Sequence, residues 1–184
     1  MLIGASTGGP AHIEKILSNL HFPLPFSIII AQHMGAEFLP SFVQQLAFKT
    51  KHSIHLCEDG LVLKKGNVYI ATNYCSLSLE ASDIKFKVQE VQNIHFNPDI
   101  NHLFSSGVAF CFTNTLLAII LTGIGEDGVI GATKLAQNGV ECIAESEESS
   151  IVYGMPARAK ESVANIQVLH LDQIIDAIDS FGKR

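Results

Sequence analysis

Short apolar runs alternate with helical spacing along the first fifty residues. Residues 1–5 and 26–31 are continuous apolar runs that are too short for helices and typical of strands buried on both faces of a parallel sheet. Apolar residues spaced three and four apart follow each run and predict two helices, through Ile13, Ile16, Leu17 and Leu20 and then through Phe38, Phe42, Val43, Leu46 and Ala47. The predicted order is strand, helix, strand, helix.

The middle of the chain has a different pattern, which predicts an antiparallel excursion. Residues 53–57, 67–72 and 75–79 are short strand-like runs separated by turns that contain glycine or asparagine. Residues 84–91 alternate apolar and polar side chains, as in an edge strand with one solvent-facing side.

Alternation of strands and helices returns in the second half. A helix is predicted from Pro98 to Val108, and the apolar run 116–121 predicts a central strand. Further helices are predicted at 129–137, 157–163 and 172–178, with strands at 140–144 and near Val168. This alternation predicts an α/β fold: a doubly wound, mainly parallel sheet with helices on both faces. Because a domain averages about 150 residues, we expect residues 1–184 to form one domain.

Charge and composition exclude several classes of ligand. Asp and Glu number 18 against 12 Lys and Arg, a formal net charge of −6, which argues against binding to nucleic acid or to an anionic membrane surface. No apolar run approaches the ~20 residues of a membrane helix, and the N-terminus lacks the features of a signal peptide. We therefore expect a cytoplasmic protein that does not insert into a membrane.

The cysteines and the one close histidine pair do not form a metal-binding pattern. The chain has no C-x-x-C pair, so neither a disulfide framework nor a zinc site is predicted, and we expect most cysteines to be buried: Cys57, Cys75, Cys111 and Cys142. His52 and His55 lie three apart on a predicted strand and point to opposite faces, so they cannot chelate one ion.

Three predicted turns that follow apolar strands carry candidate catalytic residues. Ser6 follows the first strand at the entrance to a helix, His33 follows the second strand, and Asp127 follows the run 116–121. In a parallel α/β sheet the carboxyl ends of the strands lie at one edge, so these side chains are expected to meet there. Serine, histidine and aspartate together can perform nucleophilic acyl transfer. Each has a plainer interpretation: Ser6 and Asp127 as helix caps, and His33 as a hydrogen-bonded structural residue.

The third turn also matches a dinucleotide-binding motif. Gly123, Gly125 and Gly128 form G-x-G-x-x-G between a strand and a helix, and Glu145 follows at the end of the next predicted strand. This pattern favours an NAD-dependent oxidoreductase as an alternative. Against it, Glu126 and Asp127 place two carboxylates where a pyrophosphate would sit.

Five sequence blocks, in order, resemble the catalytic domain of the bacterial chemotaxis protein-glutamate methylesterase (CheB) family and span nearly the whole chain. They are Ile3 to Pro10 (IGASTGGP), Gln32-His33-Met34, Val68 to Ala71 (VYIA), Leu121 to Gly128 (LTGIGEDG) and Val152 to Pro156 (VYGMP). The resemblance implies hydrolysis of γ-glutamyl methyl esters on the cytoplasmic helices of methyl-accepting chemoreceptors, and deamidation of receptor glutamines. It implies no metal or organic cofactor.

The resemblance also assigns roles to single residues. Ser6 would be the nucleophile, His33 the general base and then the general acid, and Asp127 the carboxylate that orients the imidazole. The backbone N–H of Ile124 would help to bind the oxyanion, with Thr7 as a neighbouring support. A third interpretation, from another functional class, is a catalytically silent module that binds receptor helices, with the same residues only as caps and turn formers.

The sequence departs from the family at three places. Isoleucine stands at 124 where methionine is common, which leaves a backbone donor in place. Residues 96–101 (FNPDIN) keep the proline but replace the more typical His-Arg-Pro-Ser pattern. Family members usually carry a phosphorylatable receiver domain first, whereas the first predicted strand here begins at Met1. We therefore expect no receiver domain in this chain, and esterase activity that needs no phosphodonor.

Overall fold

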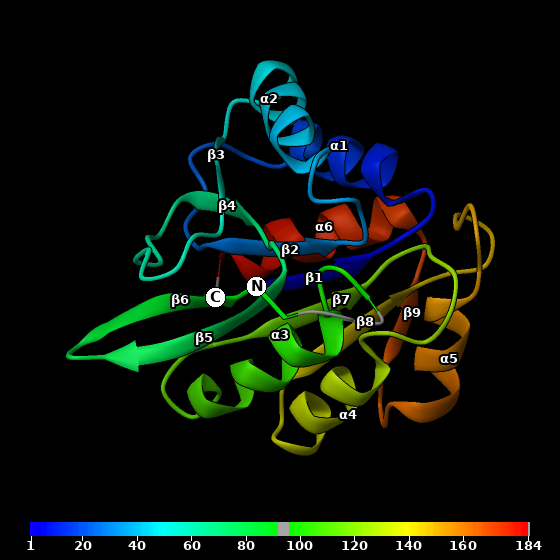
Figure 1. The fold of residues 1–184 in the computed structure, drawn as a ribbon. Coiled ribbons are helices and arrows are strands. Elements are labelled where there is room, and N and C mark those ends of the chain that lie inside the picture. The colour runs from blue at the N-terminus through cyan, green and yellow to red at the C-terminus, as the bar shows by residue number, and fades with distance from the viewer. Residues whose placement is uncertain (92–95, 184) are drawn as a thin grey trace.

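A seven-stranded parallel sheet forms the centre of the molecule in the computed structural model, which describes residues 1–91 and 96–183 (Figure 1). Its strands, in spatial order, are β3 (Ser53–Leu56), β4 (Asn67–Ile70), β2 (Ile28–Gln32), β1 (Leu2–Ala5), β7 (Leu117–Ile120), β8 (Glu141–Glu145) and β9 (Gln167–Leu169). All neighbouring pairs are parallel, and β1, β2 and β7 are buried along their whole length. This is the arrangement that the continuous apolar runs predict.

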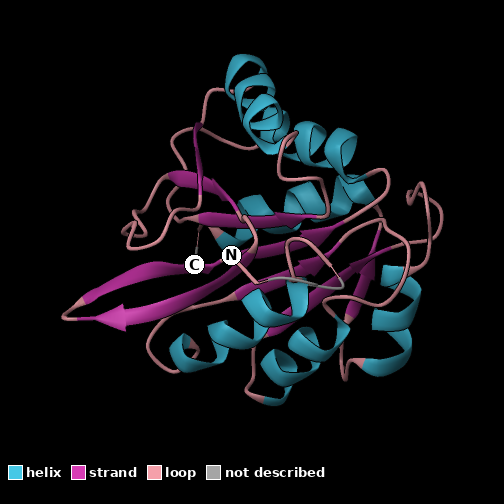
Figure 2. Cartoon of the chain, viewed as in Figure 1, coloured by secondary structure: helices cyan, strands magenta, loops and turns pink. Residues whose placement is uncertain are grey.

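Helices cover both faces of the sheet, as Figure 2 shows. One face packs against α1 (Gly9–Asn19), α2 (Leu39–Lys49) and α6 (Leu171–Phe181), whose buried leucines and isoleucines join Ile3, Ile30 and Ile119 in one core cluster. The other packs against α3 (Ile100–Gly107), α4 (Val129–Gln137) and α5 (Met155–Ser162). A short 3₁₀ helix, Val108–Phe110, follows α3. The predicted doubly wound α/β fold is therefore confirmed.

The antiparallel part is smaller than the sequence pattern predicts. Among the strands of the described residues, β5 (Tyr74–Glu80) and β6 (Asp83–Gln89) pair antiparallel, as a hairpin that extends away from the sheet in Figure 1, and an isolated antiparallel bridge joins Val62 to Lys85 of β6. Residues 53–57 and 67–72 were expected in the same excursion, but they supply β3 and β4, which are parallel to the rest of the sheet. The residues between β3 and β4 form a long crossover instead of a tight turn, which is what a parallel pair requires.

Strand order reverses at β1, which fixes where a ligand can bind. The chain runs from β1 to β2 on one side and later returns to β7 on the other side of β1. In open α/β sheets the crevice outside the carboxyl ends of the strands at such a point is the usual binding place. Ser6, His33 and Asp127 all follow these three strands.

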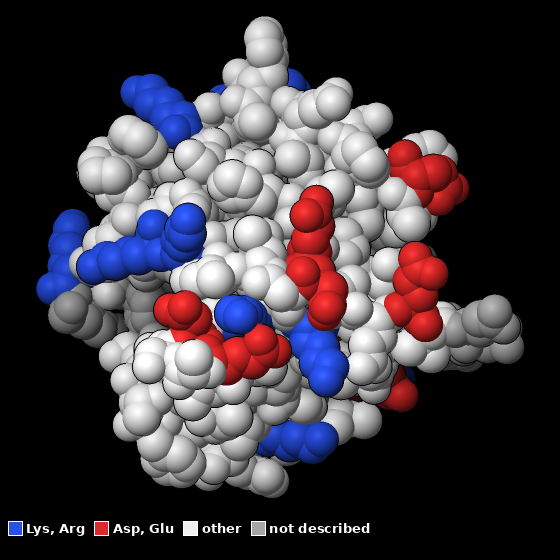
Figure 3. Space-filling model, turned by 60° about the vertical axis from the view of Figure 1, so that its left-hand side comes forward, with Lys and Arg blue, Asp and Glu red and all other residues white. Residues whose placement is uncertain are grey.

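Surface charge is mixed in sign. On the face drawn in Figure 3, several Asp and Glu side chains lie next to Lys and Arg side chains near the middle of the view. Large areas elsewhere on this face carry no charged side chain. Within the described part of the chain, no helix has the length and apolar character needed to cross a membrane.

His52 and His55 lie on opposite sides of the chain at β3, as their spacing predicts. His52 is buried, and its Nε2 lies 2.9 Å from the carbonyl oxygen of Leu17, whereas His55 is exposed. The Nδ1 of His52 has no hydrogen-bond partner among the described residues. Burial lowers the pKa of His52 from its ordinary value of 6.5, and the bond to Leu17 offsets this only in part.

Acidification is expected to destabilise the fold through His52. Because the pKa of His52 is lower in the folded state, the neutral imidazole contributes fully to the free energy of unfolding above pH 6.5, the ordinary value. This contribution is lost as the pH falls through the folded-state pKa. The free energy of unfolding then changes by at most about 1.4 kcal/mol per pH unit. Chemical denaturation at pH 7, 6 and 5 measures this. His52→Gln should reduce the pH dependence more than His55→Gln at the exposed position does. Equal slopes in the two variants would contradict the assignment.

Candidate active site

Ser6 lies in a tight turn between β1 and α1. Its N–H donates to the carbonyl oxygen of Thr122 (3.0 Å), and its carbonyl oxygen accepts from the N–H of Gly9 (2.8 Å). Gly8 has φ 86°, a left-handed conformation that glycine adopts without strain, and a Cβ there would collide with Ile151. The turn therefore fixes the Ser6 backbone, while the Ser6 hydroxyl makes no hydrogen bond to any described residue.

His33 and Asp127 form a hydrogen-bonded pair. The Nε2 of His33 lies 2.8 Å from Oδ2 of Asp127, and the two side chains are 13% and 1% exposed. The His33 N–H donates to the carbonyl oxygen of Ala5 (2.9 Å), the residue before Ser6. The ring of Phe96 stacks on the imidazole, with centroids 5.1 Å apart and planes at 5°. The contact with Asp127 thus holds one edge of the imidazole, and the ring of Phe96 covers one of its faces.

Among the described residues, four donors surround the Asp127 carboxylate. Besides His33, Oδ2 accepts from the N–H of Ile100 (2.8 Å), and Oδ1 accepts from the N–H groups of Asn101 (2.9 Å) and Gly128 (2.8 Å). An acceptor-only carboxylate suits this arrangement, since every neighbour is a donor. Asp127 therefore also serves as a helix cap, but for the first turn of α3 and not for the helix that follows it in sequence.

Gln32 connects the turn that contains Ser6 to the turn that contains His33. It is the last residue of β2 and is buried, and its amide nitrogen donates to the carbonyl oxygens of Ser6 and His33, each at 2.9 Å. A Cβ on Gly9 would overlap this amide, so the glycine provides the space for it. The sequence pattern alone assigns Gln32 no role beyond its place next to His33. A polar residue at the end of an otherwise apolar strand is the feature of the sequence that could indicate one.

Thr122 and Gly123 contact the other side of the turn that contains Ser6. The Thr122 hydroxyl donates to the carbonyl oxygen of Thr7 (2.9 Å) and accepts from the N–H of Val152 (2.9 Å). Gly123 packs directly beneath the serine: a Cβ at 123 would lie 2.6 Å from the Ser6 Cβ and 2.5 Å from the sulfur of Met155. The absence of a side chain at 123 therefore sets how closely the two turns approach.

Gly123→Ala is expected to displace Ser6. Because the new methyl group overlaps the Ser6 side chain, and because a 1 Å misplacement can cost about 10²-fold in rate, we expect a loss of roughly that size. The measurement is the rate of covalent labelling of the serine by a fluorophosphonate. Gly107→Ala, which crowds Leu2 at the other end of the sheet, is the control for general overpacking. Similar labelling rates in the two variants would contradict a local effect.

The two residues proposed to support the oxyanion lie at the rim of the site. Ile124 follows Gly123 and its side chain is exposed (62%), and Thr7 is exposed beside Ser6. Within the described part of the chain, the backbone N–H groups of Ile124 and Thr7 have no hydrogen-bond acceptor. Both turns therefore present free donors, as an oxyanion site requires.

The alternative of a dinucleotide site is not favoured. Glu145, the acidic residue that this motif would need to bind a ribose, is fully buried (0% exposed), and its carboxylate is hydrogen-bonded to His12, Thr122 and Ser149. Asp127, at the entrance to α4, lies where a pyrophosphate would have to bind. The glycines of this motif instead allow the turn to pack on Ser6.

The family-divergent stretch 96–101 contributes to the site in two ways. Phe96 stacks on His33, and the Asp99 side chain caps α3 by accepting from the N–H of His102 (2.7 Å).

Two of the buried cysteines, Cys57 and Cys142, have thiols that are harder to ionise than usual. Burial raises the pKa of the Cys57 thiol, with a further contribution from Cys75, and burial raises that of Cys142 to about 11. As expected, most of the cysteines are buried.

Comparisons with known proteins agree on one family. The CheB methylesterase family model matches residues 1–178. The chain is 34% identical over 173 residues to protein-glutamate methylesterase/protein-glutamine glutaminase 1 of Saccharophagus degradans, with 94% of this chain and 47% of the relative covered. It is 35% identical over 182 residues to the group 3 operon protein of that name from Rhizobium meliloti, with 98% and 51% covered. The chain thus spans about half the length of the curated relatives it matches.

A solved structure extends the likeness to three dimensions. The crystal structure of the Thermotoga maritima CheB methylesterase catalytic domain superposes with a TM-score of 0.90 at 30% sequence identity, and the match covers 98% of this chain and 96% of that one. The family model covers nearly the whole sequence, and the fold agrees with it. The chain therefore belongs to the CheB methylesterase family.

Proposed function

We propose that this chain is a protein-glutamate methylesterase whose catalytic domain is formed by residues 1–184, with Ser6, His33 and Asp127 as its catalytic triad. The observation that carries the proposal is the 2.8 Å contact between His33 and Asp127 beside the Ser6 turn. Family membership supports it, because relatives are named protein-glutamate methylesterase/protein-glutamine glutaminase. The names of these relatives also support the second activity, deamidation of glutamine.

The hydrogen bond to Asp127 determines which nitrogen of His33 acts as the base. Nε2 carries the proton that Asp127 accepts, so Nδ1 is the ring nitrogen with a free lone pair. In the proposed first step, Nδ1 takes the Ser6 hydroxyl proton while Oγ attacks the ester carbonyl carbon. Asp127 then balances the charge of the imidazolium and keeps it in this tautomer.

The remaining steps return the enzyme to its starting state. The tetrahedral intermediate collapses, the imidazolium gives its proton to the leaving methoxide, and methanol departs from a glutamyl ester on Ser6. His33 next removes a proton from water, and the resulting hydroxide attacks the acyl carbon. The bond from that carbon to Ser6 Oγ then breaks, the imidazolium returns its proton to Oγ, and the glutamate carboxyl group is released. With a glutamine substrate the same acyl-enzyme forms and ammonia leaves.

The free N–H groups of Ile124 and Thr7 are the proposed donors to the oxyanion. They come from the two turns that meet at Ser6, and neither N–H donates to a described acceptor, which leaves both for this role in the proposal. A backbone donor explains why isoleucine at 124 is compatible with the role. No metal or organic cofactor takes part in these steps.

The proposed substrate is a surface of another protein. His33 is partly exposed, and Ile124 stands at the rim, so a side chain on the surface of a helix can reach the site. We propose the cytoplasmic helices of methyl-accepting chemoreceptors as partners and the cytoplasm as the location, with no nucleic acid and no insertion into a membrane. The family and the names of the relatives support this proposal.

The test is product release by the unmodified chain. Incubation with receptor membranes carrying methyl-labelled glutamyl esters should release methanol, and receptor with unmodified glutamines should release ammonia. The His33→Ala variant gives the background rate. Release of neither methanol nor ammonia above that background would contradict the proposal. Binding to receptor without methanol release and without fluorophosphonate labelling of Ser6 would instead identify a silent binding module.

A further inference from the structure

A second carboxylate, outside the proposed triad, is buried beneath residues 6–8, the turn between β1 and α1 that carries Ser6 and is called the nucleophile turn below. Glu145 is the last residue of β8 and is 0% exposed. A carboxylate is rarely buried in this way unless its oxygens are fully hydrogen-bonded, because removal from water disfavours the charge. The mechanism proposed above gives Glu145 no role, and the dinucleotide interpretation that singled it out is not favoured.

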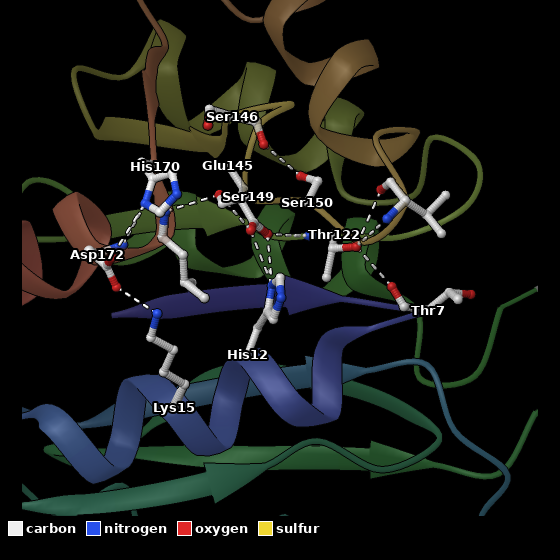
Figure 4. Close-up of polar contacts among 12 residues, drawn as sticks. Thr7, His12, Lys15, Thr122, Glu145, Ser146, Ser149, Ser150, His170 and Asp172 are labelled. Atoms are coloured by element: carbon white, nitrogen blue, oxygen red, sulfur yellow. Dashed lines mark hydrogen bonds and ion pairs between the residues drawn. The ribbon is translucent and has the colours of Figure 1, made fainter.

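Three donors from three separate chain segments meet at Glu145 (Figure 4). The N–H of Thr122, after β7, lies 2.9 Å from Oε2, and the Ser149 hydroxyl lies 2.9 Å from Oε1. Nδ1 of His12, on α1, lies 3.2 Å from Oε2 and 3.1 Å from Oε1. His12 is itself buried. One carboxylate therefore joins the end of β7, helix α1 and the loop after β8.

Each of these segments is linked to the nucleophile turn, either directly or through Thr122 and Gly123. Thr122 accepts the Ser6 N–H at its carbonyl oxygen and donates its hydroxyl to the Thr7 carbonyl. Helix α1, which carries His12, begins three residues after Ser6. The loop that contains Ser149 continues to Val152, whose N–H donates to the Thr122 hydroxyl and whose carbonyl accepts the Gly123 N–H.

We propose that Glu145, together with His12, is a positioning residue for the Ser6 nucleophile. Through Thr122 it fixes the strand end on which the Ser6 backbone rests, and through His12 it fixes the helix that follows. Glu145 touches neither the substrate nor the reacting atoms, since it is fully buried. This inference rests on the proposed function and extends it by explaining what holds the serine in place.

The proposal predicts a change in turnover and not in substrate binding. Removal of the carboxylate in Glu145→Leu releases the Thr122 N–H and should misplace Ser6 by a fraction of an ångström. Because misplacement of 1 Å costs about 10²-fold, we expect kcat and the rate of fluorophosphonate labelling to fall by roughly 10-fold or more. KM should stay within about twofold, because a buried group cannot contact the receptor.

A conservative replacement separates positioning from folding. In Glu145→Gln the amide oxygen can still accept from Thr122, and the amide NH₂ can donate to the Ser149 hydroxyl. This variant should therefore recover most of the lost labelling rate, to within about threefold of the unmodified chain. His12→Leu removes the contact between α1 and the Glu145 carboxylate, and it should also lower the labelling rate with KM unchanged. If Glu145→Leu does not fold, this variant tests the proposal in its place.

His52→Leu is the matched control. His52 is likewise a buried histidine bonded to one partner, but it lies at β3, away from the nucleophile turn. It should lose thermal stability while Ser6 labels at the rate of the unmodified chain. Folded Glu145→Leu or His12→Leu that labels at the unmodified rate, or His52→Leu that loses reactivity to the same extent, would overturn the inference. If the unmodified chain itself does not label, the proposed function fails instead.

Discussion

Ser6→Ala is expected to reduce methanol release from methylated receptor by roughly 10⁴-fold or more, because the proposed mechanism has no second nucleophile. The loss should come without unfolding. The Ser6 hydroxyl makes no hydrogen bond to a described residue, and the contacts of the turn are made by its backbone. We therefore expect the free energy of unfolding to change by no more than about 0.5 kcal/mol.

The measurement combines turnover with chemical labelling. Initial rates of methanol release are compared for the two proteins, and a fluorophosphonate probe is followed by mass spectrometry to the peptide that contains residue 6. Thr7→Ala, which removes the adjacent hydroxyl but keeps both backbone donors, is the matched control and should still label at Ser6. Turnover by Ser6→Ala close to that of the unmodified chain would rule out the proposed mechanism.

Asp127→Asn is expected to impair both catalysis and stability. All four groups around the carboxylate are donors, so the new NH₂ must face either His33 and Ile100 or Asn101 and Gly128. Facing His33, it forces the imidazole into the tautomer with the proton on Nδ1, which cannot accept the Ser6 proton. A loss of about 10⁴-fold in kcat is the scale for a wrong tautomer.

Stability should fall for the same reason. An N–H group at the start of α3 is left opposite another donor, and a buried unsatisfied donor costs about 1–3 kcal/mol. Denaturation midpoints measure this. Asp99→Asn is the control, because asparagine can still cap α3 by accepting from His102. If Asp127→Asn unfolds at the same denaturant concentration as the unmodified chain, the described set of donors is wrong.

Much of the fold could be predicted from local pattern. The helix expected at 129–137 has those bounds, and each buried run became a central strand, because its apolar residues satisfy both faces of a parallel sheet. The pairing of β3 and β4 could not be predicted in the same way. Short strands separated by glycine and asparagine turns are compatible with hairpins, and contacts distant in sequence decided that these two strands join the main sheet.

For the candidate site, chain position was easier to predict than contacts. Strand ends place Ser6, His33 and Asp127 at one edge, but no sequence pattern shows that Asp127 caps α3, a helix that begins 27 residues earlier. The stack of Phe96 on His33 likewise depends on a loop far from β2. Gln32 was missed as a functional residue because its importance lies in two carbonyls that only the folded turns bring together.

Sharing of the Asp127 carboxylate has a thermodynamic consequence. The oxygen that accepts from His33 also accepts from the first N–H of α3, and α3 is bonded to the hairpin where the Ser106 hydroxyl accepts from the N–H of Leu77. A ligand can bind preferentially to the state in which both groups donate to this oxygen. By thermodynamic linkage, such a ligand also protects the first turn of α3 from opening. Under the proposed mechanism, fraying of that helix end and loss of the His33 orientation are therefore coupled, and amide exchange at Ile100 is expected to respond to ligands that stabilise the His33–Asp127 contact.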